Sequence, residues 1–146
     1  MDPPDGLPCH HGHQVCLTAL LCDVQAKSIF LPVIRDYSAQ TADVRQSRFL
    51  ISTSAPESSS ASPAYRWWVP ITFAPVGGNF NDTFPKAWLS EDQERRQVSG
   101  LPDSETAVVF NVQETGYYRV NYDKKNWQMI AKQLDRDHLS IHVVNR

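Results

Sequence analysis

Short runs in which apolar and polar residues alternate dominate the chain from residue 29 onward. In YRWWVPITF, four apolar side chains recur at every second position and would share one face of an extended strand: Trp67, Val69, Ile71 and Phe73. Pro70 has no N–H to donate, so this strand is expected at the edge of a sheet. Similar short runs at residues 28–34 and 44–50, separated by turn formers, are typical of a β-sandwich.

Two further alternating runs, AVVFNV and YYRVNY, are separated by the four residues QETG. A short loop that ends in glycine between two such runs predicts a β-hairpin. One face of the second strand would carry Tyr118, Val120 and Tyr122, and the other would carry Tyr117, Arg119 and Asn121. Only one face can lie in the core of a sandwich. The mixture of Tyr, Arg and Asn on the second face favours contact with another domain, with ligand binding as the alternative.

After Tyr122 the apolar period changes from two to nearly four, which predicts one face of an amphipathic helix formed by Trp127, Ile130, Ala131 and Leu134. The carboxylate of Asp123 can accept the free N–H groups of the first turn and is predicted to cap this helix. The helix is expected to end near Asp137 and His138. The expected fold is therefore mainly β, a small β-sandwich of the fibronectin or immunoglobulin type followed by a C-terminal helix.

The composition of the chain excludes several classes of function but does not indicate a particular one. With 146 residues, 14 basic and 16 acidic side chains, the chain has room for one domain and carries a formal charge of −2, so nucleic-acid binding is not expected. The serine-rich residues 52–63 lack a G-x-S-x-G motif and are predicted to be a solvated linker rather than a source of a nucleophile. The apolar residues 15–22 are too few to span a membrane, and no Lys or Arg precedes Lys27, so no signal peptide is expected.

Two sets of metal-ligand residue types stand apart from these patterns. Residues 1–28 are expected to form an irregular leader, although zinc-ligand types crowd within it at Cys9, His10, His11, His13, Cys16 and Cys22. The cysteines lie seven and six positions apart rather than in C-x₂₋₄-C pairs, so an irregular segment is favoured over a metal site, and no disulfide framework is expected. His138 and His142 form H-x-x-x-H, but Leu139 stands where a zinc peptidase needs glutamate, so capping or packing is favoured there.

Three segments carry a family likeness. WWVPITF, FNVQETGYYRVNYDKKNWQMIAKQL and DRDHLSIHVVNR resemble, in this order and at comparable spacing, segments of the aminopeptidase N family of gluzincin-type zinc aminopeptidases. LPVIRDYSAQTADVRQSRFL is similar to the start of the same region, so that the resemblance covers residues 31–146. In that family the region is a β-sandwich between the catalytic domain and a helical C-terminal domain. The resemblance implies a sandwich domain at residues 29–122 and the start of a truncated helical domain at residues 123–146.

The family removes N-terminal residues from peptides, using a zinc ion held by H-E-x-x-H and a downstream glutamate, and a G-x-M-E-N loop that binds the substrate amine. Neither motif occurs here, because no histidine is followed by Glu and neither Met1 nor Met129 precedes Glu-Asn. We therefore expect no catalytic, cofactor-binding or metal-binding residue in this chain, no bound zinc, and no activity of the chain alone. The alternative is a stand-alone, non-catalytic β-sandwich that serves as a binding or adhesion module.

The resemblance also implies partners and a location. The partners would be the catalytic and helical domains of a full-length protein, with peptides as the family's substrates and a homodimer as a further assembly. An extracellular or plasma-membrane location is favoured, without a transmembrane segment in this chain. The single N-glycosylation sequon, Asn81-Asp82-Thr83, makes Asn81 a candidate for glycosylation in such a setting.

Overall fold

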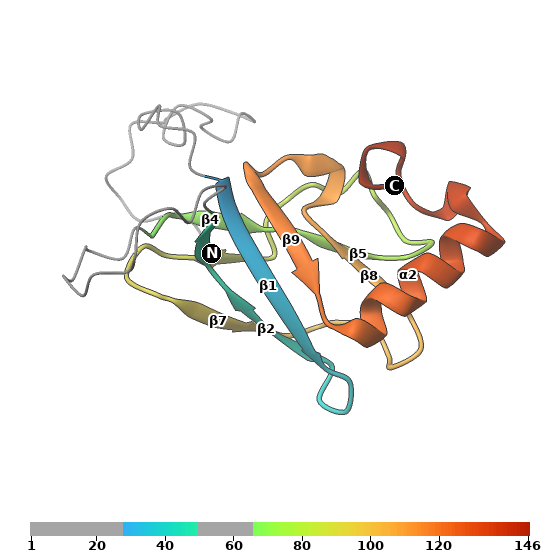
Figure 1. Cartoon of the computed structure of the whole chain (residues 1–146), viewed down its shortest axis with the longest axis horizontal. Coiled ribbons are helices and arrows are strands. Elements are labelled where there is room, and N and C mark those ends of the chain that lie inside the picture. Colours follow the sequence, from blue (N-terminus) through green and yellow to red (C-terminus); the bar gives the residue numbers. More distant parts are fainter. Residues whose placement is uncertain (1–27, 50–65) are drawn as a thin grey trace, which may run out of the picture.

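The computed structural model describes residues 28–49 and 66–146, and most of their regular structure is strand (Figure 1). One longer helix follows the strands, so the prediction of a mainly β fold with a C-terminal helix is confirmed. The strands are β1 (Ser28–Asp36), β2 (Thr41–Arg45), β3 (Ser47–Phe49), β4 (Val69–Ile71), β5 (Phe73–Pro75), β6 (Ala87–Leu89), β7 (Arg95–Val98), β8 (Val108–Phe110) and β9 (Tyr118–Tyr122). The helices are α2 (Lys124–Arg136) and the 3₁₀ turns η1 (Val112–Glu114), η2 (His138–Ser140) and η3 (Val143–Asn145).

Strand β1 is the centre of the larger sheet. It pairs antiparallel with β2, where Val33 lies opposite Val44, and with β3, while β7 pairs with the far side of β2. On its other side β1 pairs in parallel with β9, from Ile29 opposite Tyr118 to Val33 opposite Tyr122. Figure 1 shows β1 and β9 side by side, with β4, β5 and β8 lying behind them.

Two short two-stranded sheets, β4–β6 and β5–β8, form the second layer of the fold. The main core lies between the layers, because buried side chains from both meet in one cluster that includes Leu31, Val33, Val44, Ile71, Leu89, Val108 and Phe110. This packing of two apolar faces agrees with a small β-sandwich. Polar and apolar residues alternate along β2, where Ala42 and Val44 are buried and their neighbours face outward.

The apolar run at residues 67–73 faces the core as predicted, with Val69, Ile71 and Phe73 buried and Trp67 packed against them. It is not one strand, however, because it breaks at Thr72 into β4 and β5. Thr72 is buried, its carbonyl accepts from the N–H of Asn111 at 3.0 Å, and its hydroxyl accepts from the N–H of Val112 at 2.9 Å. Pro70 lies in the two-stranded β4–β6 sheet, where each strand is an edge.

The predicted hairpin between residues 107–112 and 117–122 is wrong. Strand β8 pairs with β5, whereas β9 pairs with β1, so the two runs belong to opposite layers. The connection turns sharply because Asn111, Gln113 and Glu114 adopt the left-handed conformation, with φ of 55°, 54° and 52°. The amide of Asn111 holds this turn by donating to the carbonyls of Gly116 and Tyr118 and accepting from the N–H of Gly116.

Helix α2 begins and ends as predicted, but its buried face is rotated by about one residue. The carboxylate of Asp123 accepts from the N–H of Asn126 at 3.0 Å and caps the first turn. Asn126 and Ile130 are buried, whereas Trp127 is 45% exposed and Ala131 lies on the outer side. The rotation follows from the Asn126 amide, which binds the main chain of Val108 and so places a polar residue at the centre of the interface.

A second apolar cluster joins the helix to the sheets. Ile130 and Ile141 pack with Ala74, Val109 and Val112, which come from the β5–β8 layer and the turn after it. The sandwich and the helical C-terminal residues therefore share a continuous packed interior in this structure.

Buried Arg35 of β1 connects the first turn of α2 to the larger sheet. Arg35 is 5% exposed, and its guanidinium donates to the carbonyl of Thr106 at 2.8 Å, to those of Pro102 and Asp103 at 3.1 and 3.2 Å, and to Oδ1 of Asn126 at 3.1 Å. Burial lowers the pKa of Arg35, and the nearby Tyr37, Asp123 and Asp103 oppose that shift. We call Arg35, Tyr37, Asp123 and Asn126 the Arg35 cluster.

The carboxylate of Asp123 completes the Arg35 cluster. It accepts from the hydroxyl of Tyr37 at 2.7 Å and from the N–H of Arg35 at 3.3 Å, in addition to capping α2. Burial acts to raise the pKa of Asp123, but these hydrogen bonds outweigh it and hold the pKa below its usual value. One carboxylate thus links β1, the residues after it and the helix.

Candidate functional site

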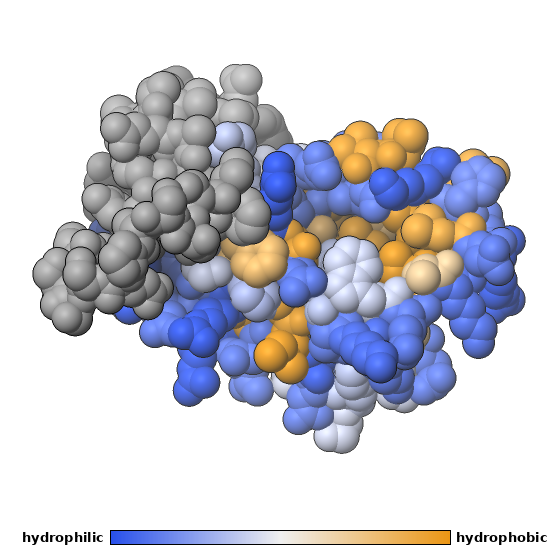
Figure 2. Space-filling model, viewed as in Figure 1, coloured by the Kyte–Doolittle hydropathy of each residue, from blue (hydrophilic) through white to orange (hydrophobic). Residues whose placement is uncertain are grey.

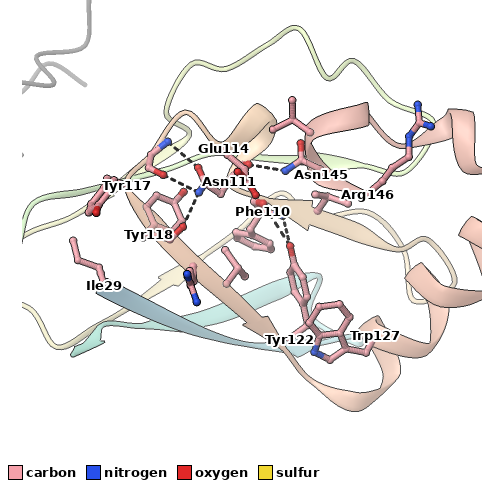
Figure 3. A pocket seen from close by; sticks show the side chains of 15 residues that line it. Ile29, Phe110, Asn111, Glu114, Tyr117, Tyr118, Tyr122, Trp127, Asn145 and Arg146 are labelled. Atoms are coloured by element: carbon pink, nitrogen blue, oxygen red, sulfur yellow. Dashed lines mark hydrogen bonds between the residues drawn. The ribbon is translucent and has the colours of Figure 1, made fainter. Parts of the chain in front are cut away.

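A groove with a volume of about 650 Å³ opens beside β9, between that strand, the end of β8 and residues 144–146 (Figure 3). Its buried lining includes Ile29, Phe110 and Tyr118, whereas Trp127 and Val144 are each 45% exposed. Figure 2 shows apolar surface gathered in this region, between α2 and the C-terminal end of the chain. The groove exists because β8 and β9 diverge into separate layers instead of forming a hairpin.

Three polar side chains bind main-chain groups in the region where β8 and β9 separate. The hydroxyl of Tyr122 accepts from the N–H of Phe110 at 2.8 Å and donates to its carbonyl at 3.5 Å. Asn126 accepts from the N–H of Val108 at 3.1 Å and donates to its carbonyl at 2.8 Å, and Asn111 binds the main chain where the loop enters β9. Tyr122 and Asn126 thereby satisfy the β8 main chain on the side where a hairpin partner would have lain.

Gly116 is required at the entrance to β9 because the ring of Tyr118 lies directly against it. A Cβ at this position would meet Cε1 of Tyr118 at 2.2 Å and Oδ1 of Asn111 at 3.2 Å. Both neighbours are buried, and the amide of Asn111 is fixed by its hydrogen bonds, so neither can move without cost.

We expect Gly116→Ala to lower the free energy of unfolding by about 2 kcal/mol, since overpacking a close-fitted core commonly has this effect. Urea unfolding followed by tryptophan fluorescence measures the loss. Combining Gly116→Ala with Tyr118→Leu removes the ring atoms that clash. The double variant should therefore lose less stability than the sum of the two single losses. If the two losses simply add, the ring of Tyr118 does not restrict the side chain at position 116.

The tyrosines of the groove are protonated packing groups at neutral pH. Burial raises the pKa of Tyr118 to about 12, and burial also raises the pKa of Tyr122. The Tyr122 ring meets Trp127 edge-on with centroids 5.0 Å apart and lies 6.2 Å from Phe110. A phenol that keeps its proton at neutral pH cannot serve as a general base or as a nucleophile.

The two faces predicted for β9 are those observed. Tyr118 is buried and Val120 and Tyr122 pack against the core, whereas Arg119 and Asn121 are exposed and Tyr117 is 62% exposed. Asn121 accepts from the indole N–H of Trp127 at 3.0 Å. Contact of the exposed face with another domain stays a prediction.

The histidines singled out from the sequence lie beyond the end of α2. His138 is exposed in η2, and Nδ1 of His142 accepts from the N–H of Val144 at 3.4 Å. Across residues 28–49 and 66–146, no three side chains of His, Cys, Asp or Glu come together as a metal site would need. The candidate ligands in residues 9–22 and the serines of residues 52–63 lie outside the described residues.

Asn81 is exposed in a turn, and its carbonyl accepts from the N–H of Thr83, the third residue of the sequon, at 3.2 Å. The side chain is therefore accessible to modification in the described structure. Glycosylation at this position stays a prediction.

Sequence reasoning missed the Arg35 cluster, although one signal for it was present. Arg35 lies two positions after Val33 and four after Leu31, so the period of two places it on the buried face of β1. A buried charge must find partners, and this parity could have marked Arg35 as the centre of a polar network. Asn126 gave no such signal because polar residues are common on helices.

Comparison with known proteins gives one consistent result. No protein-family model matches the chain. It is 45% identical to aminopeptidase N of Plutella xylostella over 112 residues, or 75% of this chain. It is 37% identical to aminopeptidase N of Homo sapiens over 118 residues, or 79% of this chain. It is also 36% identical over 85 residues, or 57% of the chain, to the thyrotropin-releasing hormone-degrading ectoenzyme of Rattus norvegicus.

The matched regions are short compared with these relatives. The chain spans 11% of the length of the two aminopeptidases and 8% of the ectoenzyme. Within the described residues, no helix is long and apolar enough to cross a membrane.

Proposed function

We propose, since this chain is homologous to a segment of the aminopeptidase N family, that it supplies the structural β-sandwich of a longer aminopeptidase N-like zinc metallopeptidase. The observation that carries the proposal is the extent of the match, which covers three quarters of this chain but only 11% of either aminopeptidase. The chain would hold a catalytic domain and a helical C-terminal domain in register, and it would not catalyse alone.

The geometry supports a scaffold role. The exposed face of β9 carries Tyr117, Arg119 and Asn121, a polar and aromatic mixture suited to contact between domains. Next to this face, α2 is joined to the sheets through the Arg35 cluster and the packing of Ile130. We propose residues 29–122 as the sandwich domain and residues 123–146 as the start of the helical domain.

The chemistry of the full-length protein would be the removal of N-terminal residues from peptides, with zinc supplied by residues outside this chain. Neither H-E-x-x-H nor G-x-M-E-N occurs in the 146 residues, which supports the assignment of catalysis to another domain. An extracellular or plasma-membrane location, a homodimer of the full-length protein and glycosylation at Asn81 belong to the same proposal. The relative named an ectoenzyme supports that location.

A chimera tests the scaffold role. Residues 29–146 would replace the homologous segment of human aminopeptidase N, and hydrolysis of an aminoacyl-p-nitroanilide would be measured. We expect the chimera to fold and keep at least about a tenth of the parent kcat/KM, because the replaced segment would not touch the reacting atoms. The isolated chain with added zinc should show no turnover above blank.

Two results would contradict the proposal. Chelator-sensitive hydrolysis by the isolated chain would place catalysis within these residues. A chimera that folds, as judged by a cooperative unfolding transition, but has lost activity completely would show that the segment does not serve as an interchangeable scaffold. A parent enzyme in which the same segment is replaced by an unrelated β-sandwich is the control, and it should be inactive.

The alternative of a stand-alone binding or adhesion module has one observation in its favour, the groove beside β9. The chimera distinguishes the alternatives, since a module unrelated to the peptidase architecture would not restore an active enzyme.

A further inference from the structure

The outer edge of β9 is used by the fold only in part. The N–H of Asp123 donates to the carbonyl of Val33, and Val33 lies opposite Tyr122 in the parallel ladder. In such a ladder alternate residues bond to the neighbouring strand, so Arg119, Asn121 and Asp123 direct their main-chain groups toward β1. Tyr118, Val120 and Tyr122 direct theirs to the opposite edge, which borders the groove.

Only the first part of this edge is closed. The N–H of Tyr118 donates to the carbonyl of Gly116 at 2.9 Å, and its carbonyl accepts from Nδ2 of Asn111 at 2.8 Å. In the part of the chain that the structure describes, no hydrogen bond is found on this edge for the N–H and carbonyl of Val120 or for the N–H of Tyr122. An open edge of this kind can pair with an added strand.

We propose that the edge of β9 at Val120 and Tyr122 binds an extended peptide segment of another protein chain in which apolar and acidic residues alternate. An added strand continues the two faces of the sheet, so its alternate side chains fall beside those of β9. Residues on the Val120 side enter the groove, where the side chains of Phe110 and Trp127 offer apolar contacts. Residues on the other side lie on the face of Arg119.

The positive charge of Arg119 explains why the alternate residues of the bound peptide should be acidic. Arg119 is exposed, and no ion pair is found for it among the described side chains. Arg146 also lines the groove, and Glu114 is the single acidic residue in that lining. A second copy of this chain paired through the same edge would place a second Arg119 on the same face of the extended sheet. Repulsion therefore disfavours a second copy and favours a partner with carboxylates.

Titration of the full chain with the blocked peptide acetyl-Val-Glu-Val-Glu-Val-amide tests the proposal, followed by amide NMR and hydrogen exchange. Before the peptide is added, the N–H groups of Arg119 and Asn121 should exchange slowly and those of Val120 and Tyr122 rapidly. The peptide should shift the resonances of Val120 and Tyr122 and slow their exchange. N-methylation of the peptide backbone should abolish these effects, because it removes the donors of the new ladder.

Charge reversal gives a matched pair of variants. Acetyl-Val-Lys-Val-Lys-Val-amide should bind about fivefold more weakly than the Glu peptide, and Arg119→Glu should reverse this order. Arg95→Glu is the control, since Arg95 is also an exposed strand residue, lies on β7 outside the lining of the groove, and should leave the order unchanged.

Three results would overturn the proposal. One is the absence of any shift at Val120 and Tyr122 up to the solubility limit of the Glu peptide. Another is equal binding of the Glu and Lys peptides. The third is protection of Val120 that grows with the concentration of the chain alone, which would assign the edge to a second copy.

Discussion

Asn126→Ala is expected to lower the free energy of unfolding by about 4 kcal/mol. Asn126 is fully buried, and its amide makes three hydrogen bonds, to the N–H and carbonyl of Val108 and to the guanidinium of Arg35. Alanine leaves all three partners without a replacement in a closed interior. A buried donor or acceptor that loses its partner costs about 1–3 kcal/mol, so the losses add to a large fraction of the stability of a small domain.

Asn121→Ala is the matched control, because it removes the same amide from an exposed position. Asn121 makes a single side-chain hydrogen bond, from the indole of Trp127. We expect the control to lose about 0.5 kcal/mol in the same urea unfolding experiment, since water can replace that bond. If Asn126→Ala lowers the free energy of unfolding by less than about 1 kcal/mol, the hydrogen bonds of Asn126 do not hold α2 to β8.

The period of apolar residues predicted the class of the fold because it reports local burial. Val69, Ile71 and Phe73 face the core at every second position, and Tyr118 and Val120 do so on β9. Period two describes which side of a strand is buried but carries no information on which strand lies beside it. The hairpin prediction failed at this step, since the loop after Asn111 adopts left-handed conformations that lead the chain into the other layer.

The helix face was misplaced for a related reason. Counting apolar residues alone puts Trp127 and Ala131 at the centre of the interface, whereas the structure puts Asn126 there. A polar residue can occupy the interior when every one of its groups is paired, and those partners lie far away in the sequence. The boundaries of α2 were predictable because the capping chemistry of Asp123 is local.

The groove could not be predicted from the sequence, although the aromatic side chains that line it all lie within residues 110–127. Its existence depends on β8 and β9 separating, with Tyr122 and Asn126 satisfying the main chain between them. Local patterns fixed which residues of β9 face inward. Only the parallel pairing of β9 with β1 decides that Val120 presents an open main-chain edge to the groove.

Arg35→Met is expected to lower the free energy of unfolding by about 3 kcal/mol. Methionine keeps most of the apolar stem but removes four hydrogen bonds, to Thr106, Pro102, Asp103 and Asn126. The relief of a buried charge offsets part of this loss, which is why we expect less than for Asn126→Ala. Arg45→Met on the neighbouring strand is the control, since Arg45 pairs with Glu94 at the surface and should change stability by about 0.5 kcal/mol or less.

The pair of Arg35 and Asn126 should behave as one unit, because their side chains are joined by a 3.1 Å hydrogen bond. In a double-mutant cycle, Arg35→Met combined with Asn126→Ala should lose at least about 1 kcal/mol less than the sum of the single losses. Two results would show that the Arg35 cluster does not hold α2 to the sheet. One is a double variant whose loss in the free energy of unfolding equals the sum of the single losses. The other is a loss for Arg35→Met that is no larger than the loss for Arg45→Met. Coupling of the expected size would show that Arg35 and Asn126 act together in joining α2 to the larger sheet, since neither set of hydrogen bonds is complete without the other.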